Sequence, residues 1–228
     1  MPSFGKLSDA AIAIEQALAP QGVDFGIFGG YAVAVLGGPR ESKDIDCAIG
    51  CTKEWLVENL GRVPGFRSTG NARADLASFL YGNDNILIEF FPTSLSMMRT
   101  MRVEVTGQQT GKKTTVILHP VFLYKGKLQA AATRAKHSDS VDLLFLEGKH
   151  LAELAARNHE LNKRHVGMAL KRYPHLLHSF QRLGINIADC TALAQDIDIE
   201  EIAAQRPAAN AVQNGLLWNT RTPEGASR

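Results

Sequence analysis

Long apolar runs, clustered cysteines and a strong net charge are all missing from this 228-residue chain. No apolar run approaches the roughly 20 residues that cross a bilayer, so we expect no transmembrane helix and no membrane partner. The first residues lack the apolar core of a signal peptide. The three cysteines, Cys47, Cys51 and Cys190, do not have the spacing of metal ligands. Reduced thiols and a cytoplasmic location are therefore expected.

The charge balance and the histidines give no positive evidence for a nucleic-acid partner or a histidine metal site. A net charge of +2 is too small to indicate a nucleic-acid partner by itself. The seven histidines show no metal-binding spacing. Hydrophobic content of 45% and charged content of 21% are ordinary for a globular protein, and the length suits one large or two small domains.

The most informative segment runs from residue 25 to residue 46. It reads as an apolar strand at 25–28, the pair Gly29 and Gly30, a short helix, and a strand that carries Asp44 and Asp46. Side chains two apart in a strand lie on the same face, so the two carboxylates repel each other unless a cation, usually divalent, binds between them. A glycine pair after a strand lets the backbone approach a phosphate closely. These features together predict a magnesium–nucleotide site.

This pattern resembles the nucleotidyltransferase superfamily that includes DNA polymerase beta. It is most similar to the small aminoglycoside- and lincosamide-type members and to the toxin-type members. Their shared motif is an apolar residue, Gly-Gly or Gly-Ser, and then Asp-x-Asp or Asp-x-Glu, with a third carboxylate on a later strand. In this chain Gly29, Gly30, Asp44 and Asp46 match that motif. The match covers the first half of the chain well and the second half only loosely.

The segment before the aspartates extends the resemblance. The small antibiotic-modifying members carry an aromatic residue after the glycines and a Gly-x-x-Arg-x-(Ser/Thr)-x-x-Asp sequence. Tyr31 matches the aromatic residue, and Arg40 and Ser42 match the polar positions of the segment 37–44. The resemblance implies that Arg40 and Ser42 contact phosphate or acceptor, in a site where Gly29 and Gly30 hold the nucleotide.

The third carboxylate is expected on a strand next to the aspartates. Residues 85–91 read as a buried strand that is apolar on both faces and carries one charge, Glu89. A buried carboxylate without a partner costs several kcal/mol, so Glu89 needs a cation. The family places its third carboxylate in such a strand. We therefore predict that Asp44, Asp46 and Glu89 are the catalytic, metal-binding set, whereas Arg73 lies in a turn and is given no role.

The second half of the chain is predominantly helical and basic. Residues 122–182 contain eleven Lys or Arg against five Asp or Glu. Lys127 and Arg134 are seven residues apart, so they share one helix face, and their helix resembles the helix that follows the catalytic domain in the family. We predict that both bind the triphosphate; the alternative is a solvated helix face. Asp139 and Asp142 have two interpretations, structural or catalytic base.

The predicted fold class is α+β: a nucleotidyltransferase-like small mixed sheet with flanking helices, followed by a helical C-terminal half. The predicted domains are residues 1–118, catalytic, 119–205, helical, and 206–228, a flexible tail rich in Asn, Gly, Pro and Ser. Strands are expected near 25–28, 44–49, 76–81, 86–91, 101–105 and 114–118. Helices are expected near 10–18, 31–36, 53–60, 122–134, 141–146, 151–163, 166–183 and 199–204, and Pro174 is the expected point of interruption in 166–183.

The resemblance implies a specific reaction. The protein would transfer a nucleoside monophosphate from a nucleoside triphosphate, such as ATP, to a hydroxyl-bearing acceptor, with two-metal Mg²⁺ or Mn²⁺ chemistry and release of pyrophosphate. The favoured acceptor is a small molecule. One alternative is nucleotidylation of tRNA or protein, and nucleic acid is not favoured as a partner. Another is a member that has lost the chemistry and reuses the fold for binding or another reaction. The acceptor and the oligomeric state do not follow from the sequence.

Overall fold

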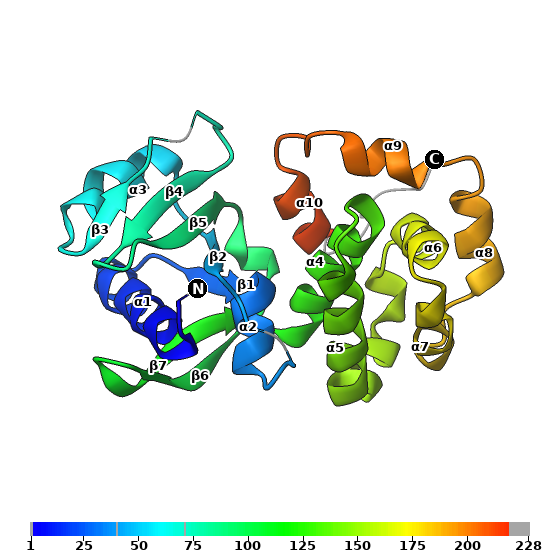
Figure 1. Ribbon diagram of the computed structural model, residues 1–228, viewed down its shortest axis with the longest axis horizontal. Coiled ribbons are helices and arrows are strands. Elements are labelled where there is room, and N and C mark those ends of the chain that lie inside the picture. Colours follow the sequence, from blue (N-terminus) through cyan, green and yellow to red (C-terminus); the bar gives the residue numbers. More distant parts are fainter. Residues whose placement is uncertain (1, 40, 71, 219–228) are drawn as a thin grey trace. The chain divides into compact units, whose positions relative to one another are not determined.

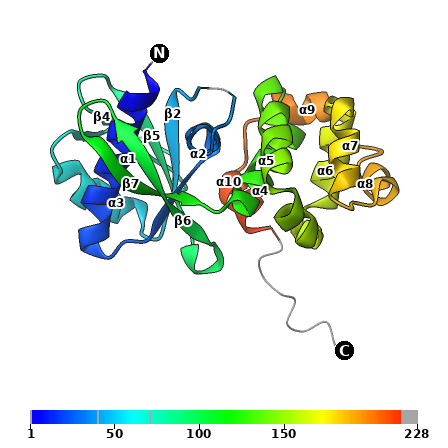
Figure 2. The same ribbon diagram turned by 90° about the horizontal axis from the view of Figure 1, so that it is seen from below.

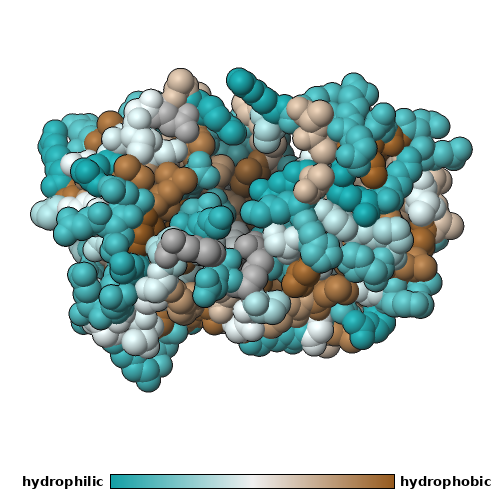
Figure 3. All heavy atoms as spheres, in the orientation of Figure 1, coloured by the Kyte–Doolittle hydropathy of each residue, from teal (hydrophilic) through white to brown (hydrophobic). Residues whose placement is uncertain are grey.

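The computed structural model describes residues 2–39, 41–70 and 72–218. The chain divides into two compact units, Met1–His119 and Pro120–Arg228 (Figure 1). In the described residues the N-terminal unit contains a seven-stranded mixed sheet, and the C-terminal unit is helical. The predicted α+β class is therefore confirmed. Polar side chains cover most of the surface seen in Figure 3, and apolar side chains form separate patches.

The sheet brings the two aspartates and Glu89 to its centre. Its strand order is β3-β4-β5-β2-β1-β7-β6, and β2 is parallel to β5, as β1 is to β7, while the other neighbours are antiparallel. The strands are β1 (Phe25–Phe28), β2 (Asp44–Ile49), β3 (Phe66–Ser68), β4 (Ala77–Tyr81), β5 (Ile86–Pro92), β6 (Thr100–Gly107) and β7 (Gly111–Leu118). The edge strand β3 was not predicted, because three residues are too few to show a period.

Helix α1 (Phe4–Leu18) packs on the sheet, against strands that include β6 and β7 (Figure 2). It begins six residues before the predicted start, because Ser3 rather than Ser8 is its N-cap. Ser8 is instead buried and accepts a hydrogen bond from the Tyr31 hydroxyl at 3.1 Å. The unit also contains α2 (Gly29–Val35), α3 (Lys53–Asn59) and the 3₁₀ turns η1 (Ala19–Gln21), η2 (Leu60–Arg62) and η3 (Leu95–Met97).

The C-terminal unit is organised around α4 (Pro120–Thr133), which packs against α5, α6 and α10. The other helices are α5 (His137–Ala156), α6 (Lys163–Arg172), α7 (Leu177–Arg182), α8 (Ile187–Leu193), α9 (Ile199–Ala204) and α10 (Ala211–Leu217), with the 3₁₀ turns η4 (Asn158–Glu160) and η5 (Pro174–Leu176). The helix expected over 166–183 is interrupted at Pro174, the expected position, because proline has no N–H to donate. The helices expected over 141–146 and 151–163 form one helix, α5, which is kinked at His150 and ends at Ala156, seven residues before the expected end.

The segment 206–228 differs from the predicted flexible tail in its described part. Residues 211–217 form α10, in which Leu216 is fully buried. Gln129 of α4 donates a hydrogen bond to the Ala211 carbonyl at 2.5 Å. Gly215 lets the two helices approach, since a Cβ at that position would collide with the Gln129 side chain. Residues 219–228 lie outside the described part of the chain.

Across the described ranges, no helix combines the length and the apolar character needed to cross a bilayer.

Candidate functional site

Three carboxylates share one face of the central sheet. Asp46 of β2 pairs in register with Glu89 of the parallel strand β5, and Asp44 lies two residues before Asp46. Register partners on parallel strands project from the same face, and so do residues two apart. The intervening partners Ile45 and Ile88 are both fully buried on the opposite face. The three acids are half-buried, so they can be reached from solvent while the strands that hold them are packed.

Gly29 forms the wall of this site beside Asp46. It follows the end of β1, where Phe28 is the antiparallel partner of Asp46. Its φ is +69°, a conformation that residues with a side chain rarely adopt. A Cβ at position 29 would lie 2.0 Å from Oδ2 of Asp46. Glycine is therefore required here for two reasons, and the Asp46 carboxylate lies directly against the backbone that leads into Gly30 and α2.

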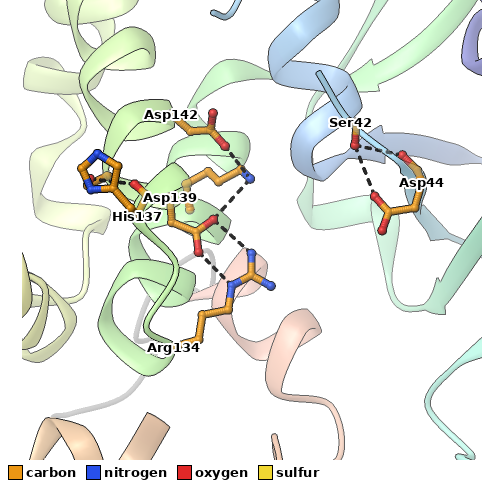
Figure 4. Close-up of polar contacts among 8 residues, drawn as sticks. Ser42, Asp44, Arg134, His137, Asp139 and Asp142 are labelled. Atoms are coloured by element: carbon orange, nitrogen blue, oxygen red, sulfur yellow. Dashed lines mark hydrogen bonds and ion pairs between the residues drawn. The ribbon is translucent and has the colours of Figure 1, made fainter. Parts of the chain in front are cut away.

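Ser42 lies next to Asp44. Its hydroxyl is 3.1 Å from the Asp44 carbonyl oxygen and 3.2 Å from Oδ1 of the same residue (Figure 4). The side chain is buried, at 3% exposure. A hydroxyl in this position donates to Asp44 and restricts the orientation of its carboxylate, which is a role that the sequence did not indicate. Contact of Ser42 with phosphate stays a prediction, and Arg40 lies outside the described residues.

Arg73 is a site residue that the sequence analysis missed. It donates two hydrogen bonds to the buried Asp75, from Nε to Oδ1 at 3.0 Å and from Nη2 to Oδ2 at 2.6 Å. Lys53 donates to the Arg73 carbonyl at 2.5 Å and fixes the loop from a second side. The Arg-x-Asp pair just before a strand was the available signal. The consequence is a positive charge held close enough to Glu89 to alter its pKa.

The pKa of Glu89 reflects this crowding. Burial raises the pKa above its usual value, the charge of Asp44 raises it further, and the charge of Arg73 opposes both. A divalent cation would remove the repulsion between the acids. Among the described residues, no group of three or more His, Cys, Asp or Glu is arranged to hold a metal ion. Mg²⁺ commonly uses one or two carboxylates and takes its other ligands from substrate phosphates and water. The acidic face fits such an open site and does not form a closed cage.

Lys127 lies in a buried ionic network of the C-terminal unit. Its Nζ is 2.7 Å from Oδ2 of Asp142 and 3.5 Å from Oδ1 of Asp139, and all three side chains are at most 5% exposed. Breaking such a buried pair costs about 3–5 kcal/mol. These contacts favour the structural interpretation of the two aspartates. Binding of triphosphate by Lys127 stays a prediction.

Arg134 completes this network from the surface. It donates from Nε to Oδ2 of Asp139 at 2.8 Å and from Nη2 to Oδ1 at 3.0 Å (Figure 4). Burial raises the pKa of Asp139, but hydrogen bonds from Arg134 and the charge of Lys127 outweigh burial and hold the pKa below its usual value. Asp139 is therefore a paired carboxylate at neutral pH. The Arg134 side chain is 52% exposed, and its predicted contact with triphosphate is untested.

One solved structure of another protein has a similar fold. No family model matches the chain, and no curated protein matches it in sequence. An antigenic nucleotidyltransferase-like protein from Paracoccidioides brasiliensis superposes with a TM-score of 0.53 and 14% identity, over 78% of this chain and 93% of that one. The lincosamide antibiotic adenylyltransferase LnuA, with lincomycin bound, gives a TM-score of 0.43 and 14% identity, over 60% of this chain and 93% of that one. The first likeness shows that this chain has a nucleotidyltransferase-like fold.

Proposed function

We propose that this protein transfers a nucleoside monophosphate from a nucleoside triphosphate to a hydroxyl group of a small-molecule acceptor and releases pyrophosphate. The observation that carries the proposal is the shared face of Asp44, Asp46 and Glu89 in a nucleotidyltransferase-like fold. A cluster of like charges has no structural benefit without a cation, so its presence favours a metal–nucleotide site.

Asp44 and Asp46 would hold Mg²⁺ or Mn²⁺, and Glu89 would complete the site. The bound cation would neutralise charge on the phosphate oxygens during transfer. Ser42 orients Asp44 through its hydroxyl, at 3.2 Å from Oδ1. The backbone N–H groups of Gly29 and Gly30, the first two residues of α2, would bind phosphate oxygens.

Glu89 is the proposed base. The acceptor oxygen forms a bond to the α-phosphorus while the bond to the oxygen that leads to the β-phosphate breaks, and that electron pair leaves with pyrophosphate. Glu89 accepts the proton of the acceptor hydroxyl. Burial is the largest cause that raises the pKa of Glu89, and a raised pKa makes it a stronger base than a solvated glutamate. The charge of Arg73 opposes that rise.

Lys127 and Arg134 are the proposed triphosphate ligands from the C-terminal unit. The Arg134 side chain is 52% exposed while Asp139 holds it. Cations that are already positioned lose less conformational entropy when they bind a phosphate. If Lys127 and Arg134 bind the triphosphate, variants of these two residues should lose affinity for the nucleotide.

The reaction is tested by transfer of label from α-³²P-labelled nucleoside triphosphates with Mg²⁺. The acceptor pools are small-molecule extract, bulk tRNA and lysate protein, each supplied separately. The proposal expects label in the small-molecule fraction and none from γ-labelled nucleotide. Label in tRNA or protein alone would support nucleotidyl transfer but show that the acceptor is a macromolecule and not a small molecule. No transfer to any pool by a folded protein that binds metal and nucleotide would contradict the proposal.

A further inference from the structure

A second candidate site lies wholly within the C-terminal unit. A cavity of about 590 Å³ opens between η4, the first turn of α6, α8, α9 and Trp218. This volume lies within the range of about 300–1,000 Å³ that is typical of small-molecule pockets. None of the residues assigned to nucleotide, metal or catalysis lines it. A ligand in this cavity would therefore be distinct from the substrates of nucleotidyl transfer.

One side of the cavity is apolar and incompletely covered. Trp218 and Leu193 line it with exposures of 45% and 55%, although most large apolar side chains of the described chain are buried. Leu161, Met168 and Ile202 add further apolar surface. Single exposed apolar residues are normal, but their convergence on one concave surface is typical of a binding site.

The rings at this site are flat and neutral. The His165 ring lies 6.4 Å from the Trp218 ring, centroid to centroid, at an interplanar angle of 42°. Burial and the charge of Arg164 lower the pKa of His165 to about 4, so the imidazole is uncharged at neutral pH. An aromatic ligand would therefore meet two planar side chains and no charge at this point.

The charge of the cavity is one-sided. Its lining contains Lys163 and Arg164 and, among the described residues, no Asp or Glu. Lys163 is paired with Asp189 at 2.8 Å. In the described part of the chain, Arg164 has no ion-pair partner, although it is exposed beside the cavity. An anionic group on a ligand would find an available guanidinium here.

We propose that this cavity binds a small organic anion with a planar, apolar body. The ring system packs on Trp218 and His165, and the anionic group binds Arg164. Size, apolar surface and charge sign each support this ligand class, and each is an independent observation.

The test compares two fluorescent probes that differ in one charge. The anion is 8-anilino-1-naphthalenesulfonate, and the neutral analogue with the same rings is N-phenyl-1-naphthylamine. We expect saturable 1:1 binding of the anion to the full-length protein and weaker binding of the neutral probe. Arg164→Gln should weaken the anion by about tenfold or more, the loss expected for one charge-assisted hydrogen bond, and leave the neutral probe unchanged.

Matched variants separate this site from adventitious adsorption. Lys149→Gln removes an exposed cation of the same unit that does not line the cavity, and it should leave both affinities unchanged. The chain has two tryptophans, so Trp55→Phe leaves Trp218 as the sole tryptophan, and its emission should be quenched by the anion. Equal affinities for the two probes, equal effects of Arg164→Gln and Lys149→Gln, or unchanged Trp218 emission would each overturn the proposal. Thermal melts confirm that each variant is folded.

Discussion

Asp46 and Glu89 are register partners on neighbouring parallel strands, so two acidic side chains project from the same face of the sheet. Asp44 adds a third negative charge on that face and contributes to the raised pKa of Glu89. Without a cation this arrangement costs free energy, because like charges are held together in a partly desolvated place. The site should therefore be less stable than its surroundings until it binds metal and nucleotide.

Glu89→Gln should raise the melting temperature of the protein at neutral pH in the absence of metal. A folded-state pKa above the unfolded value of 4.5 means that the native state binds more protons between the two values. Stability is therefore present below 4.5 and is lost as the pH rises through the folded-state pKa. Glutamine cannot ionise and avoids that loss.

Differential scanning calorimetry at a series of pH values measures this effect. Glu58→Gln is the control, because Glu58 is exposed and only its i,i+4 contact with Arg62 is lost. A melting temperature of Glu89→Gln that is no higher than that of wild type at neutral pH would contradict the raised pKa.

Arg73→Gln should shift the pKa of Glu89 further upward. Among the described residues, its guanidinium is the positive charge that opposes burial and Asp44 in setting that pKa. The ¹³C resonance of the Glu89 carboxyl, followed against pH, gives the value directly. Asp44→Asn should move the same titration downward. If the pKa of Glu89 shifted in the same direction in both variants, this electrostatic account would be ruled out. The loss of activity at acidic pH should follow the same titration of Glu89.

Gly29→Ala should destabilise the protein and abolish the increase in melting temperature caused by Mg²⁺ with nucleoside triphosphate. The added Cβ collides with Oδ2 of Asp46 and displaces that carboxylate. Gly82→Ala is a matched control, because Gly82 has a φ of +63° and open space around its Cβ position. Both variants carry the backbone cost of about 1–2 kcal/mol, but only Gly29→Ala should lose the ligand response. An intact response in Gly29→Ala would separate Asp46 from the metal.

The central strands followed from sequence because their pattern is local. Alternation with a period of two placed Asp44 and Asp46 on one face, and a single charge in an apolar strand singled out Glu89. The hydrogen bonds of Ser42 and Arg73 could not be predicted from the sequence, because each depends on the conformation of a loop and on one particular carboxylate that accepts the bond. Ser42 donates to Asp44, and Arg73 donates to Asp75.

In the C-terminal unit, too, the sequence predicted positions along helices but not the contacts between distant residues. The spacing of Lys127 and Arg134 predicted that they share one helix face. It did not predict which acidic residues pair with them. Helix α10 lies in a segment whose composition suggested a loose tail. It is stabilised by close contact of Gly215 with Gln129 of α4, which depends on tertiary packing.

Lys127→Ala should weaken nucleotide binding by about 1–3 kcal/mol, the range for a hydrogen bond to a charged group. It should also lower stability, because Asp142 loses a cation at 2.7 Å. Lys125→Ala is the matched control, since Lys125 is a buried lysine of the same helix that is paired with Glu160 at 3.4 Å. Isothermal titration below both melting transitions separates affinity from stability. Equal nucleotide affinity in the two variants would assign Lys127 to structure alone.

The measurement that tests the central claim most directly is pyrophosphate release with a nucleoside triphosphate and a hydroxyl-bearing acceptor, with and without Mg²⁺. We predict release in the wild-type protein that requires the cation and is lost in Asp44→Ala and in Asp46→Ala, while Asp24→Ala, which removes an exposed acid, retains it. Release that persists in the double variant Asp44→Ala/Asp46→Ala, or that is indifferent to the cation, would contradict the account.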